Sequence, residues 1–442
     1  MIISIASKRM LDLFDRLKFA PSLWLGILIG IVMPVVSGLV FPTYHHMLAT
    51  PWLEWTKLLE APFLVCELLV VCFAVHQGMK ISRFTEPLSR DLKIASALFL
   101  AGLWYSSLFV SAVPATSVAQ SVGTIIHILF AFSIFHLFKA RNSRNFKSFW
   151  MSLGVGLLAL ALYTAWRFLF PIPASQVPGG VIEWDFALPG FISVRYFGTW
   201  TGAIAAFFIA LVIQRGHNVR PSWPEFFFFV SMSMTIWSGT RAAILGIMVA
   251  FAAIMLSQRR IPALSLIGRL CIITGLAATI AWLLLPEGLP VFRLFSGGEA
   301  ADVETFTSGR VALWTATYQK WFEAPFFGWG SGSLFWEVFL GWRHTQPHNA
   351  FLQFLMSWGI VGAIGACWLL IRAVVAAQQQ TNQNHELWPF MAMLYSLLAM
   401  SMVDGALYYP RFVMVIMLCL AVILSERTSE LKAENKAGVI SQ

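Results

Sequence analysis

Apolar residues are grouped along this chain in blocks of roughly 15 to 23 residues, the length at which an α-helix spans a bilayer. The alternation of about ten residues that is typical of outer-membrane barrel strands is not present. The pattern therefore predicts an all-α, polytopic integral membrane protein. We expect about 12 transmembrane helices, with approximate cores at 22–41, 61–77, 94–113, 117–138, 148–170, 197–213, 225–239, 242–256, 270–285, 350–371, 387–403 and 412–425.

Composition excludes a soluble globular protein of this length. Hydrophobic residues make up 58% of the 442 positions and charged residues only 12%, against usual values of about 45–50% and about 25%. The five cysteines all lie inside apolar blocks, without the spacing of a disulfide framework or a metal cluster. We interpret them as ordinary buried cysteines.

The net charge of +9 would suggest nucleic-acid binding in a soluble protein, but the distribution of Lys and Arg indicates membrane topology instead. With the N-terminus inside, the inner segments hold 21 of the 30 basic residues and the outer segments hold 8, four of them in one long loop. Cytoplasmic loops collect Lys and Arg. We therefore expect two cytoplasmic termini and no nucleic-acid partner.

One outer segment, 286–349, is too long for a plain connection, and loops of this size usually carry function. Apolar residues recur at helical spacing from Val311 to Phe322 and stop before Pro325, which predicts a short amphipathic helix on the membrane surface. A second such piece is expected over 334–342. The predicted organisation is helices one to nine in 1–285, the loop 286–349, helices ten to twelve in 350–425 and a tail at 426–442.

Arginine is the residue type that stands out on the outer side. Arginine near a bilayer is costly and is usually kept for anchoring or function. Interfacial snorkelling would explain any single one of these residues, but several on one face suggest an anionic ligand, because arginine forms bidentate bonds to phosphate. The arginines at outer span ends or in the long loop are Arg195, Arg241, Arg310, Arg343 and Arg411.

Two histidines, His344 and His348, come shortly before the span at 350–371. His348 is followed by Asn349 and then by the helix itself, which places it at the membrane interface. Imidazole can take a proton from a sugar hydroxyl, although a loop histidine without chemistry is an equally good reading of the spacing alone. No metal-ligand spacing and no nucleotide-binding glycine motif occurs. We therefore expect no metal and no cofactor, with energy supplied by the substrate or by a gradient.

Several short motifs occur in the order of one known family. SGTRAA at 238–243 is followed by SGRVALW at 308–314, PFFGWGSG at 325–332, HNAFL at 348–352 and GIVG at 359–362. Each motif is weak by itself. Together, over about 125 residues and with a large outer loop before a late span, they resemble the bacterial O-antigen ligase and polymerase family.

This resemblance implies a GT-C-like glycosyltransferase of the bacterial inner membrane with its active site facing the periplasm. Such enzymes take a glycan from undecaprenyl pyrophosphate and need no metal. A ligase transfers it to a sugar hydroxyl of lipid A–core, with inversion, and membrane lipids surround the protein. The family pattern assigns catalytic roles to Arg241, Arg310 and His348. Arg195 and Arg411 would assist in binding pyrophosphate. Arg343 and Asn349 are secondary candidates. His344 is a further one, because this chain has two histidines where the pattern needs one.

The leading hypothesis is an O-antigen ligase, because the chain is compact and has a single sizeable outer loop. The alternative within the family is an O-antigen or exopolysaccharide polymerase. A rival of another class is a membrane transporter or lipid flippase. That class predicts ionisable pairs near the middle of the bilayer and two similar halves, whereas only Glu67 is a clear carboxylate within a span and no repeat is visible.

Overall fold

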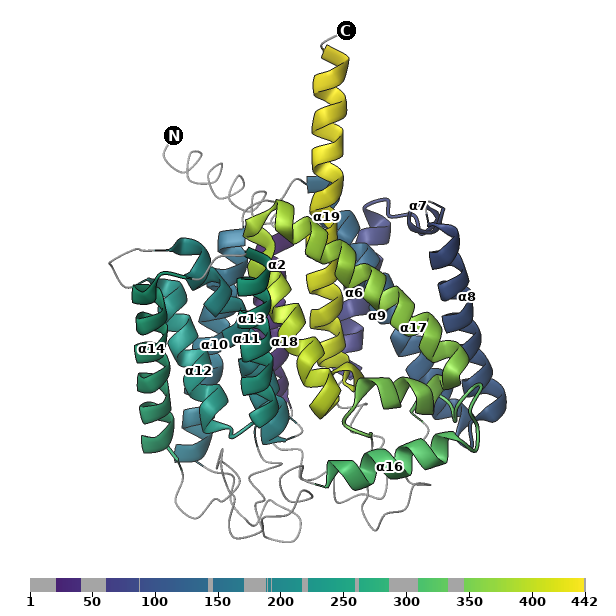
Figure 1. Ribbon diagram of the computed structural model, residues 1–442, viewed down its shortest axis with the longest axis horizontal. Coiled ribbons are helices and arrows are strands. Elements are labelled where there is room, and N and C mark those ends of the chain that lie inside the picture. Colours follow the sequence, from purple (N-terminus) through teal and green to yellow (C-terminus); the bar gives the residue numbers. More distant parts are fainter. Residues whose placement is uncertain are drawn as a thin grey trace, which may run out of the picture.

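A computed structural model describes residues 21–40, 61–86, 88–141, 146–170, 188, 190–191, 193–216, 222–258, 262–285, 309–332 and 346–440. Within these ranges the regular elements are all helical (Figure 1). They are α2 (Pro21–Ile27), η1 (Leu28–Val36), α3 (Ser37–Val40), α6 (Ala61–His76), α7 (Ser82–Thr85), α8 (Arg90–Tyr105), η2 (Ser106–Val110), α9 (Pro114–Arg141), α10 (Phe146–Leu169), α11 (Val194–Arg215), α12 (Trp223–Trp237), α13 (Arg241–Gln258), α14 (Leu264–Leu283), α16 (Arg310–Trp321), α17 (Ala350–Gln383), η5 (His385–Leu387), α18 (Trp388–Asp404), η6 (Ala406–Tyr408) and α19 (Pro410–Ile440).

The prediction of an all-helical, multi-pass membrane protein is confirmed. Eight helices in the described part are long and apolar enough to cross a membrane, and two shorter apolar helices cover Ser22–Val36 and Pro62–His76. The predicted spans 225–239 and 412–425 coincide with α12 and the first half of α19. The number of membrane crossings in the whole chain stays a prediction.

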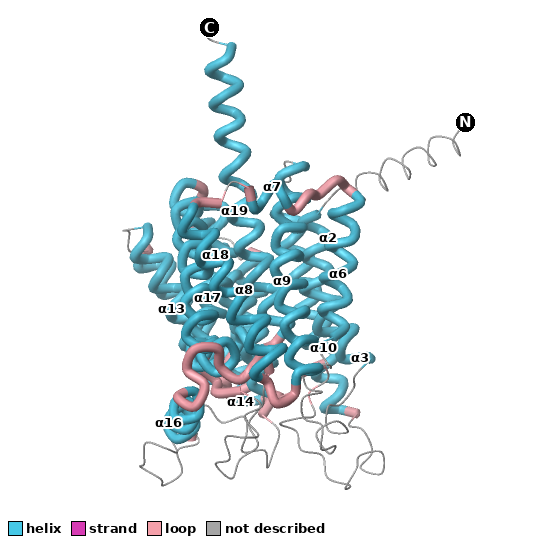
Figure 2. Tube along the Cα trace, turned by 90° about the vertical axis from the view of Figure 1, so that its right-hand side faces the viewer, coloured by secondary structure: helices cyan, strands magenta, loops and turns pink. Residues whose placement is uncertain are grey.

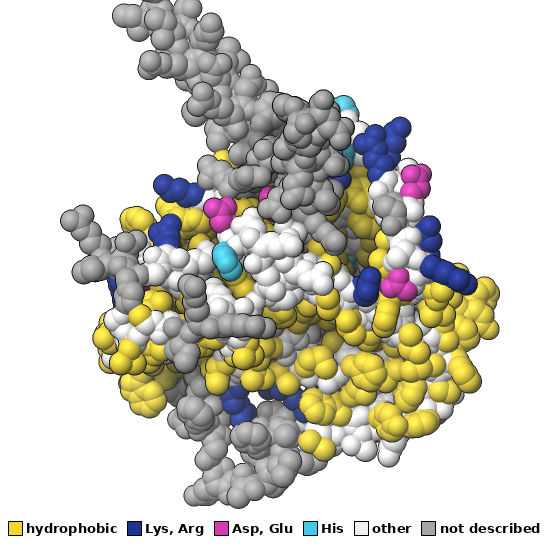
Figure 3. Space-filling view, turned by 45° about the horizontal axis from the view of Figure 1, so that its top comes forward, with side chains coloured by type: hydrophobic (Ala, Val, Ile, Leu, Met, Phe, Trp, Pro, Cys, Tyr) yellow, Lys and Arg dark blue, Asp and Glu magenta, His cyan; other side chains and the backbone are white. Residues whose placement is uncertain are grey.

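Helices run roughly parallel between two ends of the bundle (Figures 1 and 2). The short helix α7 and the C-terminal end of α19 lie at one end, whereas α16 lies across the other. Hydrophobic side chains cover much of the face shown in Figure 3, and the Asp and Glu side chains visible there lie in its upper part. Segments 78–93 and 426–440 therefore share one end, and the described part of the long loop, 309–332 and 346–349, belongs to the other.

The helix α11 forms the centre of the bundle. It is buried from Tyr196 to Ile213 and packs against α12, α13 and α18. A helix that is apolar on all sides is stable only inside a protein or a membrane. Glycine allows the closest approach: a Cβ at Gly198 would lie 2.1 Å from the Thr240 hydroxyl oxygen. This contact brings the start of α11 against the turn before Arg241.

The predicted spans 225–239 and 242–256 are two separate helices in the structure, α12 and α13. They are joined by a turn in which Gly239 adopts a φ of +64°. The amide of Thr240 donates to the Ser238 hydroxyl oxygen at 3.3 Å. Arg241 directly follows this turn and is the first residue of α13. Because α12 and α13 both pack on α11, Arg241 lies at the end of the bundle where α11 begins.

The long helix α17 is interrupted at Gly359, whose φ is +62°. The turn after α16 satisfies the backbone groups that the break leaves without helical partners. The amides of Trp329 and Gly330 donate to the carbonyls of Met356 and Ser357, at 2.7 and 3.0 Å. In return, the amides of Ile360 and Val361 donate to the carbonyls of residues 325 and 326, at 2.8 and 3.2 Å. The glycine-rich turn, residues 325–332, is therefore held against the break in α17 by backbone hydrogen bonds.

Replacing Gly359 by alanine is expected to destabilise the protein by about 2 kcal/mol or more. A side chain in the left-handed region costs about 1–2 kcal/mol, and a Cβ here would lie 2.3 Å from the backbone of Phe326. The matched control is Gly268→Ala in α14, where nothing lies within 4 Å of the added atom. Thermal unfolding of the purified variants measures both. An unchanged midpoint for Gly359→Ala would contradict the role given to the break.

Candidate functional site

Charged side chains from five segments meet at the α16 end of the bundle. The start of α11 supplies Arg195, the start of α13 supplies Arg241 and the start of α16 supplies Arg310. His348 lies just before α17, and Asp404 is the last residue of α18. Four of these residues stand at the first turn of a helix or directly before it, so the helices fix where each side chain begins.

Asp404 is the centre of the site. Its side chain is only 2% exposed, and its Oδ1 accepts a hydrogen bond from Nη2 of Arg310 at 3.1 Å. The same oxygen lies 3.6 Å from Nδ1 of His348. A buried carboxylate is costly unless it is paired, so Asp404 holds a guanidinium and an imidazole next to each other.

The position of His348 is set by its neighbours. Its φ of +53° is unusual for a residue with a side chain. Before it, the carbonyl of Pro347 accepts a hydrogen bond from the Trp314 indole of α16 at 2.8 Å. After it, Oδ1 of Asn349 caps α17 by accepting from the Leu352 amide at 3.0 Å, and its Nδ2 donates to the Met402 carbonyl at 3.1 Å. Asn349 therefore ties the start of α17 to α18 and anchors the histidine.

Positive charge is concentrated around Arg310. Burial lowers the pKa of its guanidinium, Asp404 acts in the opposite direction, and the nearby charges of Arg195 and Arg241 lower the pKa further. Three arginines that influence one another in this way repel, because like charges at short range are unfavourable. Binding an anion among them would relieve that repulsion. Arg195 and Arg241 are exposed, whereas Arg310 is half-buried.

A layer of uncharged polar groups lies behind the histidine. Nε2 of Gln346 donates to the Tyr196 hydroxyl at 3.3 Å and lies 3.4 Å from Nδ1 of His348. Gln346 and Tyr196 are both buried, and the ring of Tyr409 packs edge-on against Tyr196 with centroids 4.3 Å apart. Gly405 leaves room for the glutamine, since a Cβ there would lie 1.7 Å from its Oε1. This layer packs against the Nδ1 side of the His348 ring through Gln346.

Other candidates from the sequence are placed differently. Arg411 is buried, and its Nη2 donates to the Gly190 carbonyl at 2.6 Å. Its guanidinium also lies over the rings of Phe63 and Phe191. A side chain so enclosed cannot reach a ligand without moving, so these contacts are structural. Arg343 and His344 lie outside the described residues, as does the amphipathic piece expected over 334–342.

Asp404, Gln346 and Tyr196 are residues of the site that sequence reasoning missed. Asp404 carries a signal that was available: it is a single carboxylate directly after an apolar span, at the same end as the arginines. Gln346 and Tyr196 give no such signal. A tyrosine beside an arginine at the start of a span is equally typical of a membrane interface.

Replacing Asp404 by asparagine is expected to lower the rate of catalysis about 10- to 100-fold. The change keeps the size of the side chain but removes a charge-assisted interaction worth about 1.5–3 kcal/mol. The control is Glu323→Gln, an exposed carboxylate at the same end, paired with Lys320. The pH profile of the rate separates the roles: a shifted profile indicates that Asp404 acts through His348, and a rate unchanged from wild type removes Asp404 from the site.

A helical bundle of this kind, with a cationic site at one end, defines a multi-pass membrane protein suited to an anionic ligand. Residues 226–367 match the family model described as O-antigen ligase. This match supports the family that the motifs indicated. No curated protein sequence matches the chain. The match supports a function of the ligase or polymerase type in general.

The matched segment holds Arg241, Arg310 and His348. Arg195 and Asp404 lie outside it, before and after in the sequence. The fold therefore brings residues from three parts of the chain into one site.

Proposed function

We propose that this protein is an O-antigen ligase of the bacterial inner membrane. It transfers a glycan from undecaprenyl pyrophosphate to a sugar hydroxyl of lipid A–core, on the periplasmic side and without a metal. The observation that carries the proposal is the contact of Arg310 and His348 with one oxygen of Asp404, with Arg195 and Arg241 beside them.

The proposed reaction is a single displacement at the anomeric carbon. The acceptor hydroxyl oxygen forms the new glycosidic bond while the bond to the pyrophosphate oxygen breaks, which inverts the anomeric centre. Negative charge grows on the leaving pyrophosphate, and Arg310, Arg241 and Arg195 stabilise it. Fixed donors aimed at developing charge are usually the largest single contribution to catalysis. The arginines thus take the part that a metal ion has in other transferases.

In this proposal His348 takes the proton of the acceptor hydroxyl. Because Nδ1 faces Asp404, Nε2 is directed away from the carboxylate, toward the position that the hydroxyl would occupy. Asp404 holds the ring in place and stabilises the imidazolium that forms. A base oriented by a carboxylate is the arrangement that activates hydroxyl groups in other enzymes.

The test is transfer by the purified protein in vesicles without nucleotide or ion gradient, with undecaprenyl-pyrophosphate glycan and lipid A–core supplied together. Labelled glycan on lipid A–core supports a ligase. Lengthening of the lipid-linked glycan, with none on lipid A–core, indicates the polymerase. Movement of the lipid-linked glycan across the vesicle membrane without any new glycosidic bond would overturn the proposal in favour of a transporter.

The proposed orientation predicts where reporter enzymes become active. Fusions after Arg144 should report the cytoplasm, because that segment is one of the basic ones, and fusions within 296–304 should report the periplasm. Paired reporters that work on opposite sides of the membrane make the measurement. A cytoplasmic signal from 296–304 would rule out a periplasmic site, since the arginine site lies at the end of the bundle to which this loop belongs.

A further inference from the structure

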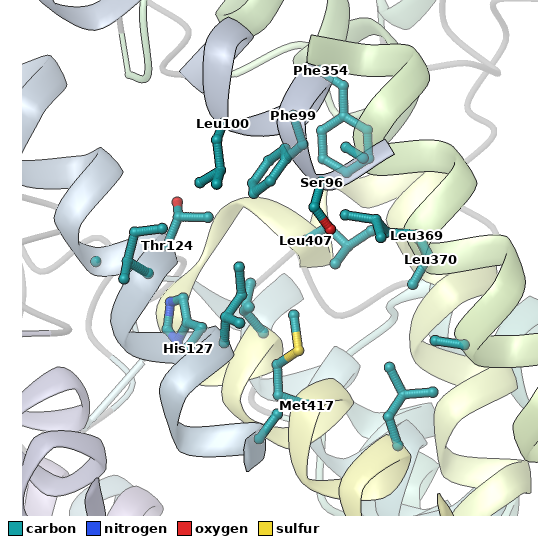
Figure 4. A pocket seen from close by; sticks show the side chains of 18 of the residues that line it. Ser96, Phe99, Leu100, Thr124, His127, Phe354, Leu369, Leu370, Leu407 and Met417 are labelled. Carbon is teal, nitrogen blue, oxygen red and sulfur yellow. The ribbon is translucent and has the colours of Figure 1, made fainter. Parts of the chain in front are cut away.

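His127 and His348 each have a carboxylate near Nδ1, but the two contacts differ. Nδ1 of His127 lies 2.8 and 2.7 Å from the two oxygens of Glu67, within hydrogen-bond distance. Figure 4 shows the His127 ring on the wall of an apolar cavity between α8, α9, α17 and α19. Nδ1 of His348 lies 3.6 Å from Oδ1 of Asp404, which is too long for a hydrogen bond. A proton on Nδ1 of His348 therefore needs an acceptor other than this carboxylate.

The side-chain amide of Gln346 is closer to this nitrogen than Asp404 is. Nε2 of Gln346 lies 3.4 Å from Nδ1 of His348 and 3.3 Å from the Tyr196 hydroxyl oxygen. The other amide atom, Oε1, is buried and has no hydrogen-bond partner among the described residues. Gln346 is only 1% exposed, so its amide pairs with neighbouring protein groups rather than with bulk water.

The charge of Asp404 decides which ring nitrogen of His348 carries the proton. A neutral imidazole has one N–H and one lone pair. A lone pair on Nδ1 would face the carboxylate oxygen at 3.6 Å and be repelled, whereas an N–H there is attracted. Nδ1 therefore carries the proton, and Nε2 keeps the lone pair that a base needs. The amide of Gln346 can accept a hydrogen bond from this N–H only through its oxygen.

We propose that Gln346 is the positioning residue that selects this tautomer of His348, by turning its amide oxygen to the Nδ1–H. The inference rests on the proposed function, in which Nε2 of His348 is the base. Half a turn of the amide about its last side-chain bond exchanges Oε1 and Nε2 and keeps the shape of the side chain. Oε1 then accepts from Nδ1 of His348 and from the Tyr196 hydroxyl, because a carbonyl oxygen has two lone pairs. Nε2 turns to the side of Gly405, next to Asp404, whose Oδ2 is buried and has no hydrogen-bond partner among the described residues.

Two substitutions distinguish an accepting side chain from a donating one. Gln346→Glu keeps the length of the side chain and presents a carboxyl oxygen that accepts in either protonation state. Gln346→Met keeps a similar volume but removes the amide. Gln380→Met is the matched control, because Gln380 is also 1% exposed and lies near the other end of α17. The thermal unfolding midpoint of each variant shows whether the fold is kept.

We expect Gln346→Met to lower kcat about 3- to 10-fold, the effect of about one hydrogen bond, and to leave the KM for the lipid-linked donor unchanged. Gln346→Glu should stay within about threefold of wild type, and Gln380→Met should match wild type. If Gln346→Glu loses as much activity as Gln346→Met, the amide acts by donating and the proposal is wrong.

The pH profile of kcat gives a second readout. Loss of an acceptor for Nδ1–H destabilises the protonated ring more than the neutral ring, so the acid limb of the profile should move to lower pH in Gln346→Met. The other charged or titratable groups around the ring are the same in both proteins: Asp404 of α18, Arg310 of α16 with its neighbours Arg195 and Arg241, and Tyr196 of α11. An acid limb that moves to higher pH would contradict an accepting amide.

The ¹⁵N resonances of the ring nitrogens report the tautomer without any substrate, because protonated and unprotonated nitrogens have well-separated shifts. In histidine-labelled protein at a pH where imidazole is neutral, wild-type His348 should carry its proton on Nδ1, and Gln346→Met should show a larger share of Nε2–H. The His348 signals are those absent from His348→Gln. The signals of His127, whose Nδ1 contacts Glu67, should be the same in every variant. A wild-type His348 protonated on Nε2, or a tautomer unchanged in Gln346→Met, would overturn the inference.

The spectrum also separates this inference from the proposed function. If wild type transfers no glycan, the proposed function fails, and the spectrum still decides whether Gln346 selects the tautomer. If transfer occurs and the tautomer does not depend on Gln346, only this inference fails.

Discussion

Glycan transfer is expected to fall by about 10³-fold when Arg310 is replaced by alanine. Arg310 is the arginine that combines partial burial with a direct bond to Asp404. Loss of one donor to a developing negative charge costs about 10²–10³ in rate, and loss of an arginine at a phosphoryl group about 10³–10⁵. Initial rates of transfer by purified protein, at saturating acceptor, provide the measurement.

Two further variants make the Arg310 result specific. Arg310→Lys should recover little activity, because an ammonium cannot form the bidentate fork of a guanidinium. Arg269→Ala removes an arginine from another ion pair, with Glu225, away from the site, and should leave the transfer rate unchanged. Full activity of Arg310→Ala, with insertion into the membrane confirmed, would remove Arg310 from the site.

Replacement of His348 by alanine is expected to lower transfer by about 10²-fold or more, the usual scale for a lost general base. His348 is held between the Pro347 carbonyl and the cap of α17, with Asp404 beside its ring. A base must stay within about 3 Å of the proton that it takes, and this anchoring supplies the required precision. His344→Ala is expected to cost much less.

Donor binding distinguishes two roles for His348. A base contributes to the rate but little to the affinity for undecaprenyl pyrophosphate, so binding by His348→Ala should match that of wild type. If binding and transfer fall together, the residue is a pyrophosphate ligand. If His344→Ala is the inactive variant, the family motif was placed on the wrong histidine.

The sequence carried the fold class because long apolar blocks have one stable arrangement in a bilayer. It also pointed to Arg241, Arg310 and His348, which the structure brings to the same end of the bundle. Sequence patterns do not encode contacts between helices that are distant along the chain. Asp404 joins Arg310 across 94 positions, and its place after an apolar span indicates the end of the bundle but not the arginine that it contacts. Arg411 shows the opposite case, since an arginine at a span end is equally able to bind a backbone carbonyl inside the protein, as Arg411 does with Gly190.

The residues of the site are supported by two units of the structure, one on each side of Asp404 Oδ1. The outer segment of α17, the glycine-rich turn and α16 are joined by backbone hydrogen bonds and by the Trp314 indole, so Arg310 and His348 belong to one unit. Asp404, Arg195 and Arg241 belong to the helices of the bundle. Asn349 joins the two units through the Met402 carbonyl, as Arg310 does through Asp404. The spacing of Arg310 and His348 is therefore set twice, by the backbone that supports both and by the one carboxylate oxygen that both approach.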